Sequence, residues 1–145
     1  MTIRRTGKRF ELNEFLARPL FAHLATASPD GPRESPIWFH WEDGALWFIG
    51  TTKDSWPRRL RAEPRCAIGI VDFDLARGFL QHVGMRGTAK VGALDVERFH
   101  RLLHRYLGQQ GGWNPWFREN VIRDVDLMVR FTPATTVMHD QSYFR

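Results

Sequence analysis

The sequence has little cysteine and no long apolar run, and each shortage excludes a class of protein. Its 145 residues include one cysteine, Cys66, so no disulfide can form within the chain, and a cytoplasmic location is expected. No stretch is apolar over the length that a bilayer requires, and the basic start of the chain is not followed by the apolar core of a secretion signal. We therefore expect neither secretion nor a membrane partner.

The composition that remains is typical of a folded domain. Hydrophobic residues make up 43% of the chain and aromatic residues 13%, which excludes a disordered protein. We expect a single domain over residues 1–145, with residues 1–10 as a loose arm. The formal net charge of +5 is compatible with nucleic-acid binding and with basic clusters that hold anionic small molecules, and the second is the stronger expectation.

Short apolar runs separated by turn residues predict a mainly β fold. Residues 20–27, 33–41 and 45–49 are joined by short turns and predict an antiparallel meander. Gly84 and Gly87 interrupt a long strand run and predict bends or bulges. The remaining expected strands are 66–73 (buried on both faces), 79–91, 127–131 and 135–139. The expected helices are 11–17, one that Asp54 caps, and one that Asp95 caps and Gly108 ends, with an apolar stripe that includes Tyr106.

About six strands with two or three short helices and bend glycines predict a small antiparallel β-barrel with peripheral helices. Such a barrel leaves an open edge, and dimerisation commonly closes it. We therefore expect a six-stranded, dimeric barrel.

A polar and basic segment, residues 51–59, follows the third expected strand and predicts an anion site at a helix start. Its hydroxyl and cationic side chains are Thr51, Thr52, Lys53, Ser55, Arg58 and Arg59. Cations in the first turns of a helix oppose the macrodipole by about 0.3–1 kcal/mol each, and a bound phosphate would make the arrangement favourable. The alternative is an ordinary polar loop with arginines in solvent, and the residues alone leave both open.

The segment Ser35-Pro36-Ile37-Trp38 suggests a second part of the same site. Pro36 cannot donate to a β-ladder, so its strand lies at a sheet edge or is bulged there. Free backbone groups beside large apolar side chains would suit a flat heteroaromatic ring. The alternative for Trp38 is a place in the core.

Other candidate chemistry in the sequence is weak. His100 and His104 have the spacing of two metal ligands on a helix, but no third ligand is evident, so we predict no metal site. Cys66 lies in an apolar run and is expected to be an inert thiol. No nucleophile elbow and no glycine-rich phosphate loop are present, and we assign no catalytic residue.

Taken together, the motifs of residues 20–133 resemble the pyridoxamine 5′-phosphate oxidase-like family of flavin-binding split β-barrels. The similar segments are Leu24-Ala25-Thr26-Ala27, Pro29-Asp30-Gly31, Ser35-Pro36-Ile37-Trp38-Phe39, Asp43-Gly44-Ala45-Leu46-Trp47-Phe48, residues 60–67, residues 86–91 and Arg130-Phe131-Thr132-Pro133. The resemblance implies a homodimer with two FMN sites at its interface.

By this resemblance, each part of the proposed site takes a role toward FMN. The backbone of Ser35, Pro36, Ile37 and Trp38 would line the isoalloxazine ring. The phosphate would be held by Thr51, Thr52, Lys53, Ser55, Arg58 and Arg59, with Trp56 beside them. The aromatic residues Trp113 and Trp116 would reach across from the partner subunit.

We therefore expect a cytoplasmic, dimeric, FMN-dependent oxidoreductase acting on a small-molecule substrate, with reduced nicotinamide as electron donor. Trp56 stands where many family members have a lysine, which makes a deazaflavin coenzyme the nearest alternative. The residues after the closing strand lack the aromatic and arginine-rich tail of true pyridoxamine phosphate oxidases, so oxidation of that substrate is not expected. The sequence also leaves open a non-catalytic flavin or haem binder and a single-stranded nucleic-acid-binding barrel.

Overall fold

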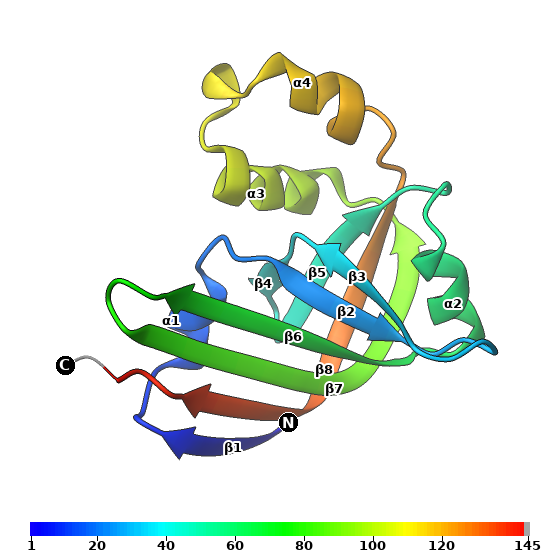
Figure 1. Ribbon diagram of the computed structural model, residues 1–145. Helices are drawn as coiled ribbons and strands as arrows, with labels where there is room; N and C mark the ends of the chain where they lie inside the picture. The colour runs from blue at the N-terminus through cyan, green and yellow to red at the C-terminus, as the bar shows by residue number, and fades with distance from the viewer. Residues whose placement is uncertain (144–145) are drawn as a thin grey trace.

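Eight strands form one curved sheet in the computed structural model, which describes residues 1–143 (Figure 1). The strands are β1 (Thr2–Gly7), β2 (Ala22–Thr26), β3 (Arg33–Ile37), β4 (His40–Glu42), β5 (Ala45–Gly50), β6 (Arg65–Asp74), β7 (Phe79–Ala93) and β8 (Leu127–Asp140). The helices are α1 (Leu12–Leu16), α2 (Trp56–Ala62), α3 (Val96–Leu107) and α4 (Pro115–Phe117), with a 3-10 turn at Gln110–Gly112 and a π-helical turn at Arg118–Ile122.

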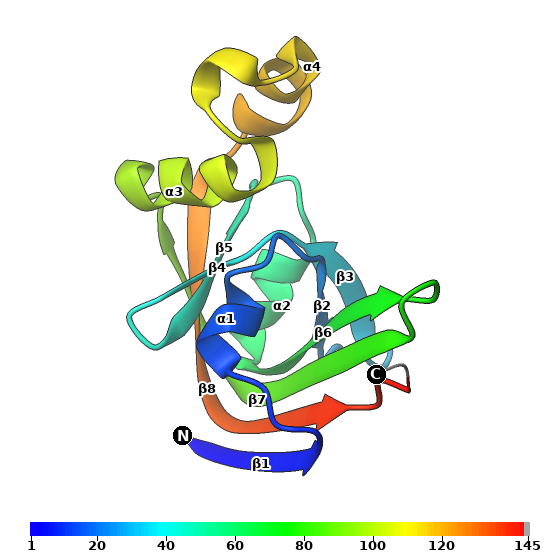
Figure 2. The same ribbon diagram turned by 90° about the vertical axis from the view of Figure 1, so that its left-hand side faces the viewer.

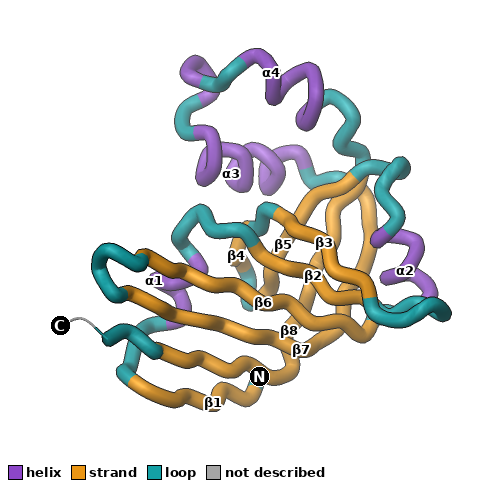
Figure 3. The backbone as a smooth tube through the Cα atoms, viewed as in Figure 1, coloured by secondary structure: helices purple, strands orange, loops and turns teal. Residues whose placement is uncertain are grey.

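The strand order is β3-β2-β6-β7-β8-β5-β4, with β1 beside β8 (Figure 3). Each pair along this path is antiparallel, so the predicted mainly β, antiparallel barrel is confirmed, with eight strands in place of six. The predicted meander is wrong, because the run 33–41 breaks into β3 and β4, which lie at opposite ends of the strand order. At the break, the Phe39 N–H donates to the hydroxyl of Tyr106 at 3.0 Å rather than to a neighbouring strand.

The first residues are ordered by the sheet, so the predicted loose arm is wrong. β1 pairs in parallel with the second half of β8, from Thr2 opposite Thr135 to Gly7 opposite Asp140. Ile3 packs against the barrel core from this strand. The sequence of β1 carries little hydrophobic pattern, because its stability comes from the backbone ladder with β8.

The long strands β6, β7 and β8 supply most of the wall. A register shift between Arg86 and Gly87 confirms a predicted bulge, at which Gly87 lies opposite Pro133. β8 continues through Pro133 as one strand, where two were expected. β6 is buried on one face only, since Val71 and Phe73 are 47% and 56% exposed on the other, and its predicted burial on both faces is wrong.

The structure has two apolar clusters, one inside the barrel and one beneath α3. Phe15, Phe39, Phe48 and Phe131 are fully buried in the barrel interior. The second cluster packs Phe99, Leu102 and Leu103 of α3 against β5 and β8, and α4 lies on the side of α3 away from the barrel (Figure 2). Asp95 caps α3 by accepting from the Arg98 N–H, and Gly108 ends it with φ 75°, as predicted.

None of the helices among residues 1–143 is long and apolar enough to cross a membrane.

Candidate functional site

The loop between β5 and α2 is closed on itself by a carboxylate. The Oδ2 atom of Asp54 accepts from the backbone N–H of Thr51 at 2.8 Å and from its hydroxyl at 3.3 Å. The same hydroxyl oxygen accepts from the N–H of Lys53 at 3.1 Å. Thr52, Lys53 and Asp54 are exposed. The prediction that Asp54 caps α2 is wrong, because its side chain accepts hydrogen bonds within the loop and Ser55 occupies the N-cap position, where its side chain makes no capping hydrogen bond.

Arg58 and Arg59 differ in how the structure holds them. Arg59 is half-buried, and its Nε–H donates to the hydroxyl of Thr26 at 2.7 Å while a terminal N–H donates to Ser55 at 2.9 Å. Arg58 is exposed. Because α2 spans only seven residues, Arg59 lies close to both of its ends, and the helix-dipole argument made from the sequence loses most of its force. The positive charge itself remains, since the first turn of α2 contains no acidic residue.

Trp56 lies in the barrel core and not at the surface of the loop. Its side chain is 6% exposed and packs against Phe48 with ring centroids 5.3 Å apart. The ring occupies the space over Gly50, where a Cβ atom would fall 2.6 Å from Cη2 of Trp56. By packing over Gly50, Trp56 holds the end of the 51–55 loop against its beginning. The buried indole therefore has no exposed face that could contact a phosphate.

The segment Ser35–Trp38 lies at the edge of the sheet, as the proline predicts. β3 is the terminal strand of the order and pairs only with β2, with Pro36 opposite His23. Ser35 is half-buried, Pro36 is exposed, and Ile37 points into the barrel. The outer edge of this strand is therefore open to a ligand among the described residues.

Trp38 is held by the last turn of α3. Its ring stacks on that of Tyr106 with centroids 4.6 Å apart and an interplanar angle of 3°. The Tyr106 hydroxyl donates to the Leu20 carbonyl at 2.7 Å, and burial raises the pKa of this phenol. Arg105 donates to the carbonyls of Leu16, Arg18 and Phe39, and burial lowers the pKa of its guanidinium. Sequence analysis missed this pair, although Tyr106 lies on the recognised apolar stripe of α3.

Trp113 and Trp116 lie in the connection from α3 to β8, above the barrel in Figure 1. Trp113 is half-buried and its indole N–H donates to the Gly108 carbonyl at 2.8 Å. Trp116 is 56% exposed and meets Phe117 edge-on, and Phe117 in turn lies 5.8 Å from Trp38. Within residues 1–143 neither tryptophan hydrogen-bonds to the 51–59 loop, so one subunit does not assemble all the predicted residues.

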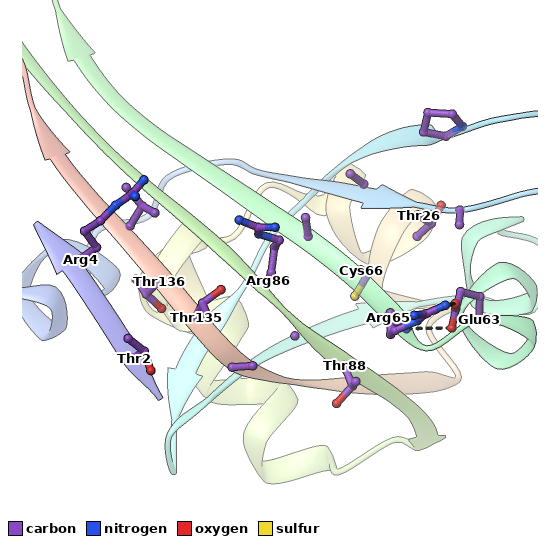
Figure 4. A pocket seen from close by; sticks show the side chains of 17 residues that line it. Thr2, Arg4, Thr26, Glu63, Arg65, Cys66, Arg86, Thr88, Thr135 and Thr136 are labelled. Carbon is purple, nitrogen blue, oxygen red and sulfur yellow. Dashed lines mark hydrogen bonds and ion pairs between the residues drawn. The ribbon is translucent and has the colours of Figure 1, made fainter.

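A hollow with a volume of about 1050 Å³ lies elsewhere, on the outer side of the sheet (Figure 4). Its walls come from the outward faces of β1, β2, β6, β7 and β8. Small or short side chains such as Ala25, Ala67 and Thr135 make its floor. It meets the loop cluster at Thr26, which lines the hollow and accepts the bond from Arg59.

The hollow contains none of the residues that the sequence singled out as binding residues. The sequence feature that could have predicted the hollow is the small side chain at alternate positions of its strands, such as Ala25 on β2 and Ala67 on β6. Alternation alone does not show which face of a sheet is left without a covering helix or loop. Cys66 also lines it, and burial raises the pKa of this thiol to about 12. The thiol therefore stays protonated at neutral pH and is a poor nucleophile, as its apolar strand predicts.

The loop cluster fits a phosphate in charge and in donor type. Lys53, Arg58 and Arg59 supply three positive charges, against the single carboxylate of Asp54. The Asp54 carboxylate already accepts hydrogen bonds from the N–H and the hydroxyl of Thr51. These two donors are therefore placed to bind an anionic oxygen. A phosphate could use the same donors once Asp54 turns into solvent.

Comparisons with known proteins show the family of the chain and agree with its fold. The family model described as pyridoxamine 5′-phosphate oxidase matches residues 10–138. No curated protein sequence matches the chain. Among solved structures, an F420 reductase has a TM-score of 0.67 at 26% sequence identity, over 89% of this chain and 98% of its own.

Two further solved structures share the fold at lower identity. General stress protein 26 from Bacillus anthracis strain Sterne has a TM-score of 0.66 at 14% identity, over 88% of this chain and 89% of its own. A FAD-binding protein from Mesorhizobium loti has a TM-score of 0.66 at 15% identity, over 90% of this chain and 92% of its own. These two likenesses concern the fold alone.

Proposed function

Because the chain belongs to the pyridoxamine 5′-phosphate oxidase family, we propose that it is a flavin-dependent oxidoreductase that uses FMN and acts on a small molecule. The single observation that carries the proposal is the cationic cluster of the 51–59 loop beside an open sheet edge. The loop carries three cations and one carboxylate, and that carboxylate accepts from donors that suit a phosphate. Bound flavin would supply the redox chemistry, and the protein would position it.

The residues divide into two groups by what they can hold. Lys53, Arg58 and Arg59 would neutralise the phosphate, with the Thr51, Thr52 and Ser55 hydroxyls as further donors. The backbone of Ser35 to Trp38, open along the outer edge of β3, would hydrogen-bond the rim of the ring. The Arg105 and Tyr106 bonds to Phe39 fix the end of that edge and so orient it.

A deazaflavin coenzyme is the second candidate, favoured by the likeness to an F420 reductase. The core position of Trp56 is compatible with both candidates, since its side chain leaves the loop cations free. Both candidates need the same cationic loop, so the two are separated by which coenzyme binds more tightly.

We further propose a homodimer in the cytoplasm with reduced nicotinamide as electron donor. The exposed Trp116, which lies apart from its own subunit's loop cluster, supports the partner-subunit role proposed for Trp113 and Trp116. Sedimentation of the protein over a range of concentrations measures the association directly.

Titration with FMN and with riboflavin, which lacks the phosphate, tests the proposal. FMN should bind more tightly than riboflavin, and each of Lys53→Ala, Arg58→Ala and Arg59→Ala should lower the FMN affinity about tenfold, as the loss of a charge-assisted contact does. The matched control is Arg61→Ala, because Arg61 is exposed on the same helix and has no partner among residues 1–143.

Two results would contradict parts of the proposal. Equal affinity for FMN and riboflavin would remove the phosphate site, and undiminished FMN binding in all three variants would place it elsewhere. Bound FMN that reduced nicotinamide does not reduce would leave a flavin-binding protein without the proposed activity.

A further inference from the structure

A small cleft lies beside the start of α3, where β5, β8 and β7 run side by side. Its volume is about 210 Å³, and its lining residues are Trp47, Lys90, Gly92, Ala93, Asp95, Met128 and Arg130. None of these residues belongs to the 51–59 loop, to Ser35–Trp38 or to the larger hollow. The cleft is therefore a separate feature of the surface, which the proposed function does not use.

Strand register places two positive charges directly against each other in this cleft. Lys90 on β7 lies opposite Arg130 on β8, and both side chains are exposed. Neither side chain has a hydrogen bond or an ion pair within residues 1–143. Like charges directly opposite each other in a sheet are destabilising. A pair that breaks this rule without a compensating contact is more often found at a functional site.

The indole of Trp47 forms one wall of the cleft and is held in place. Trp47 lies opposite Arg130 on β5, so Lys90, Arg130 and Trp47 form one row across three strands. The indole N–H donates to the Glu42 carbonyl at 2.8 Å, and Cζ of Arg98 lies 3.6 Å from the ring centroid. The wall beside the two cations is therefore preformed.

The floor of the cleft is partly bare backbone. Gly92 and Met128 lie opposite each other two residues further along the same face of β7 and β8. Met128 is 3% exposed beneath α3, whereas a Cβ atom at Gly92 would meet nothing within 4 Å. The space over Gly92 is therefore open, and a ligand could approach the backbone there.

Asp95 is the one carboxylate among the seven lining residues, and Arg98 compensates it. Its Oδ1 accepts from the Arg98 backbone N–H and its Oδ2 from the Arg98 guanidinium, both at 3.2 Å. Glu42 and Asp43 accept from the same guanidinium. Since these three carboxylates are already paired, the charges of Lys90 and Arg130 are left for a ligand.

We propose that the cleft binds a phosphate group between Lys90 and Arg130, either as free phosphate or as the end of a small phosphate monoester. A phosphate dianion matches two positive charges, and a guanidinium can donate two parallel hydrogen bonds to it while an ammonium acts as a point charge. A volume of about 210 Å³ holds the phosphate and a few further atoms, but is smaller than a pocket for a drug-sized ligand.

Calorimetric titration with inorganic phosphate and with methyl phosphate, in a phosphate-free buffer at constant ionic strength, tests the site. Lys90→Gln together with Arg130→Gln should weaken binding at least about tenfold, as the loss of charge-assisted contacts does. The control is Arg5→Gln together with Arg61→Gln, which removes the same charge from exposed positions outside the cleft and should keep the native affinity. Whichever of the two ligands binds more tightly identifies its source.

Lys90→Glu provides a test in which the variant is expected to gain stability. A glutamate opposite Arg130 would replace the repulsion by a cross-strand ion pair. In phosphate-free buffer this variant should therefore unfold at a higher urea concentration than the native protein. Added phosphate should raise the midpoint of the native protein by more than that of Lys90→Glu, because a ligand stabilises the folded state that binds it.

Four results would overturn the inference. The first is equal phosphate affinity in the native protein and in the double glutamine variant, which would place any binding elsewhere. The second is phosphate binding no tighter than that of chloride, which would leave only charge screening. The third is self-association that depends on Lys90 and Arg130 with no phosphate bound, which would give the cleft to a second copy.

The fourth is a loss of FMN affinity in the double glutamine variant as large as in Lys53→Ala, which would make the cleft part of the cofactor site. Failure of the native protein to bind FMN would affect only the proposed function. The difference in phosphate affinity between the native protein and the double glutamine variant decides the cleft in either case.

Discussion

Replacing Gly50 by alanine should destabilise the protein and distort the 51–55 loop. A Cβ atom at this position would fall 2.6 Å from Cη2 of Trp56 and 3.1 Å from Cδ1 of Leu127. Ordinary contact between such carbons begins near 3.4 Å, so the indole would have to move by about 1 Å. It cannot do so freely, because the ring is buried against Phe48.

The expected cost follows from two opposing effects. Overpacking of a well-packed core costs about 1–3 kcal/mol, and replacing glycine by alanine in a strand returns about 0.5–1 kcal/mol of backbone entropy. We expect Gly50→Ala to lower the free energy of unfolding by about 1–2 kcal/mol. In a Trp56→Leu background the six-membered ring is absent, so the same change should be neutral or stabilising, which gives a coupling of about 1–3 kcal/mol between the two positions.

Urea denaturation followed by far-ultraviolet circular dichroism measures these differences at one protein concentration, since self-association would add to the stability of the folded state. Gly92→Ala is the matched control, because a Cβ atom there meets nothing within 4 Å. Additive effects of the Gly50 and Trp56 substitutions would refute the packing argument. FMN titration of Gly50→Ala should also show weaker binding, because Trp56 and Gly50 join the two ends of the loop.

Two further predictions concern carboxylates. Asp54→Asn should strengthen FMN binding about fivefold, because one negative charge beside the phosphate is removed while an acceptor for the Thr51 N–H remains. Unchanged or weaker binding in the FMN titration would count against the loop as the phosphate site. The hydrogen bonds from Arg101, with those from His40 and Arg98, lower the pKa of Glu42 from 4.5 to about 2. The resulting stability is present above pH 4.5 and is lost as the pH falls toward 2, so the native protein should lose up to about 3 kcal/mol relative to Glu42→Gln across that range, as measured by urea denaturation at each pH. Parallel pH profiles of the two proteins would contradict this.

Features that depend on neighbouring residues were predictable from the sequence. Asp95 and Gly108 bound α3 because capping needs only a side-chain acceptor and a residue tolerant of positive φ. The hairpin at Asp43-Gly44 has φ of 56° and 68° for the same local reason. Pro36 marked an edge strand because it lacks the N–H that a second neighbour would need.

Features that depend on distant segments were not predictable in this way. Trp56 follows the polar loop in sequence, and its burial depends on the space that Gly50 and Leu127 leave inside the barrel. The pairing of β1 rests on a backbone ladder with β8, which leaves almost no mark on the side-chain pattern. The candidate site is divided in the same way, since the loop cations were visible in the sequence and the bonds of Arg105 and Tyr106 were not.

The sequence by itself determined that the chain is a mainly β barrel of this family with a cationic loop, because strand alternation, turn chemistry and charge are properties of adjacent residues. Only the tertiary structure decided which strands meet and therefore that Arg4 and Arg86 share one hollow, more than 80 residues apart in the chain. The physical reason is that backbone ladders fix the register between strands, and register places side chains from distant segments on a common face.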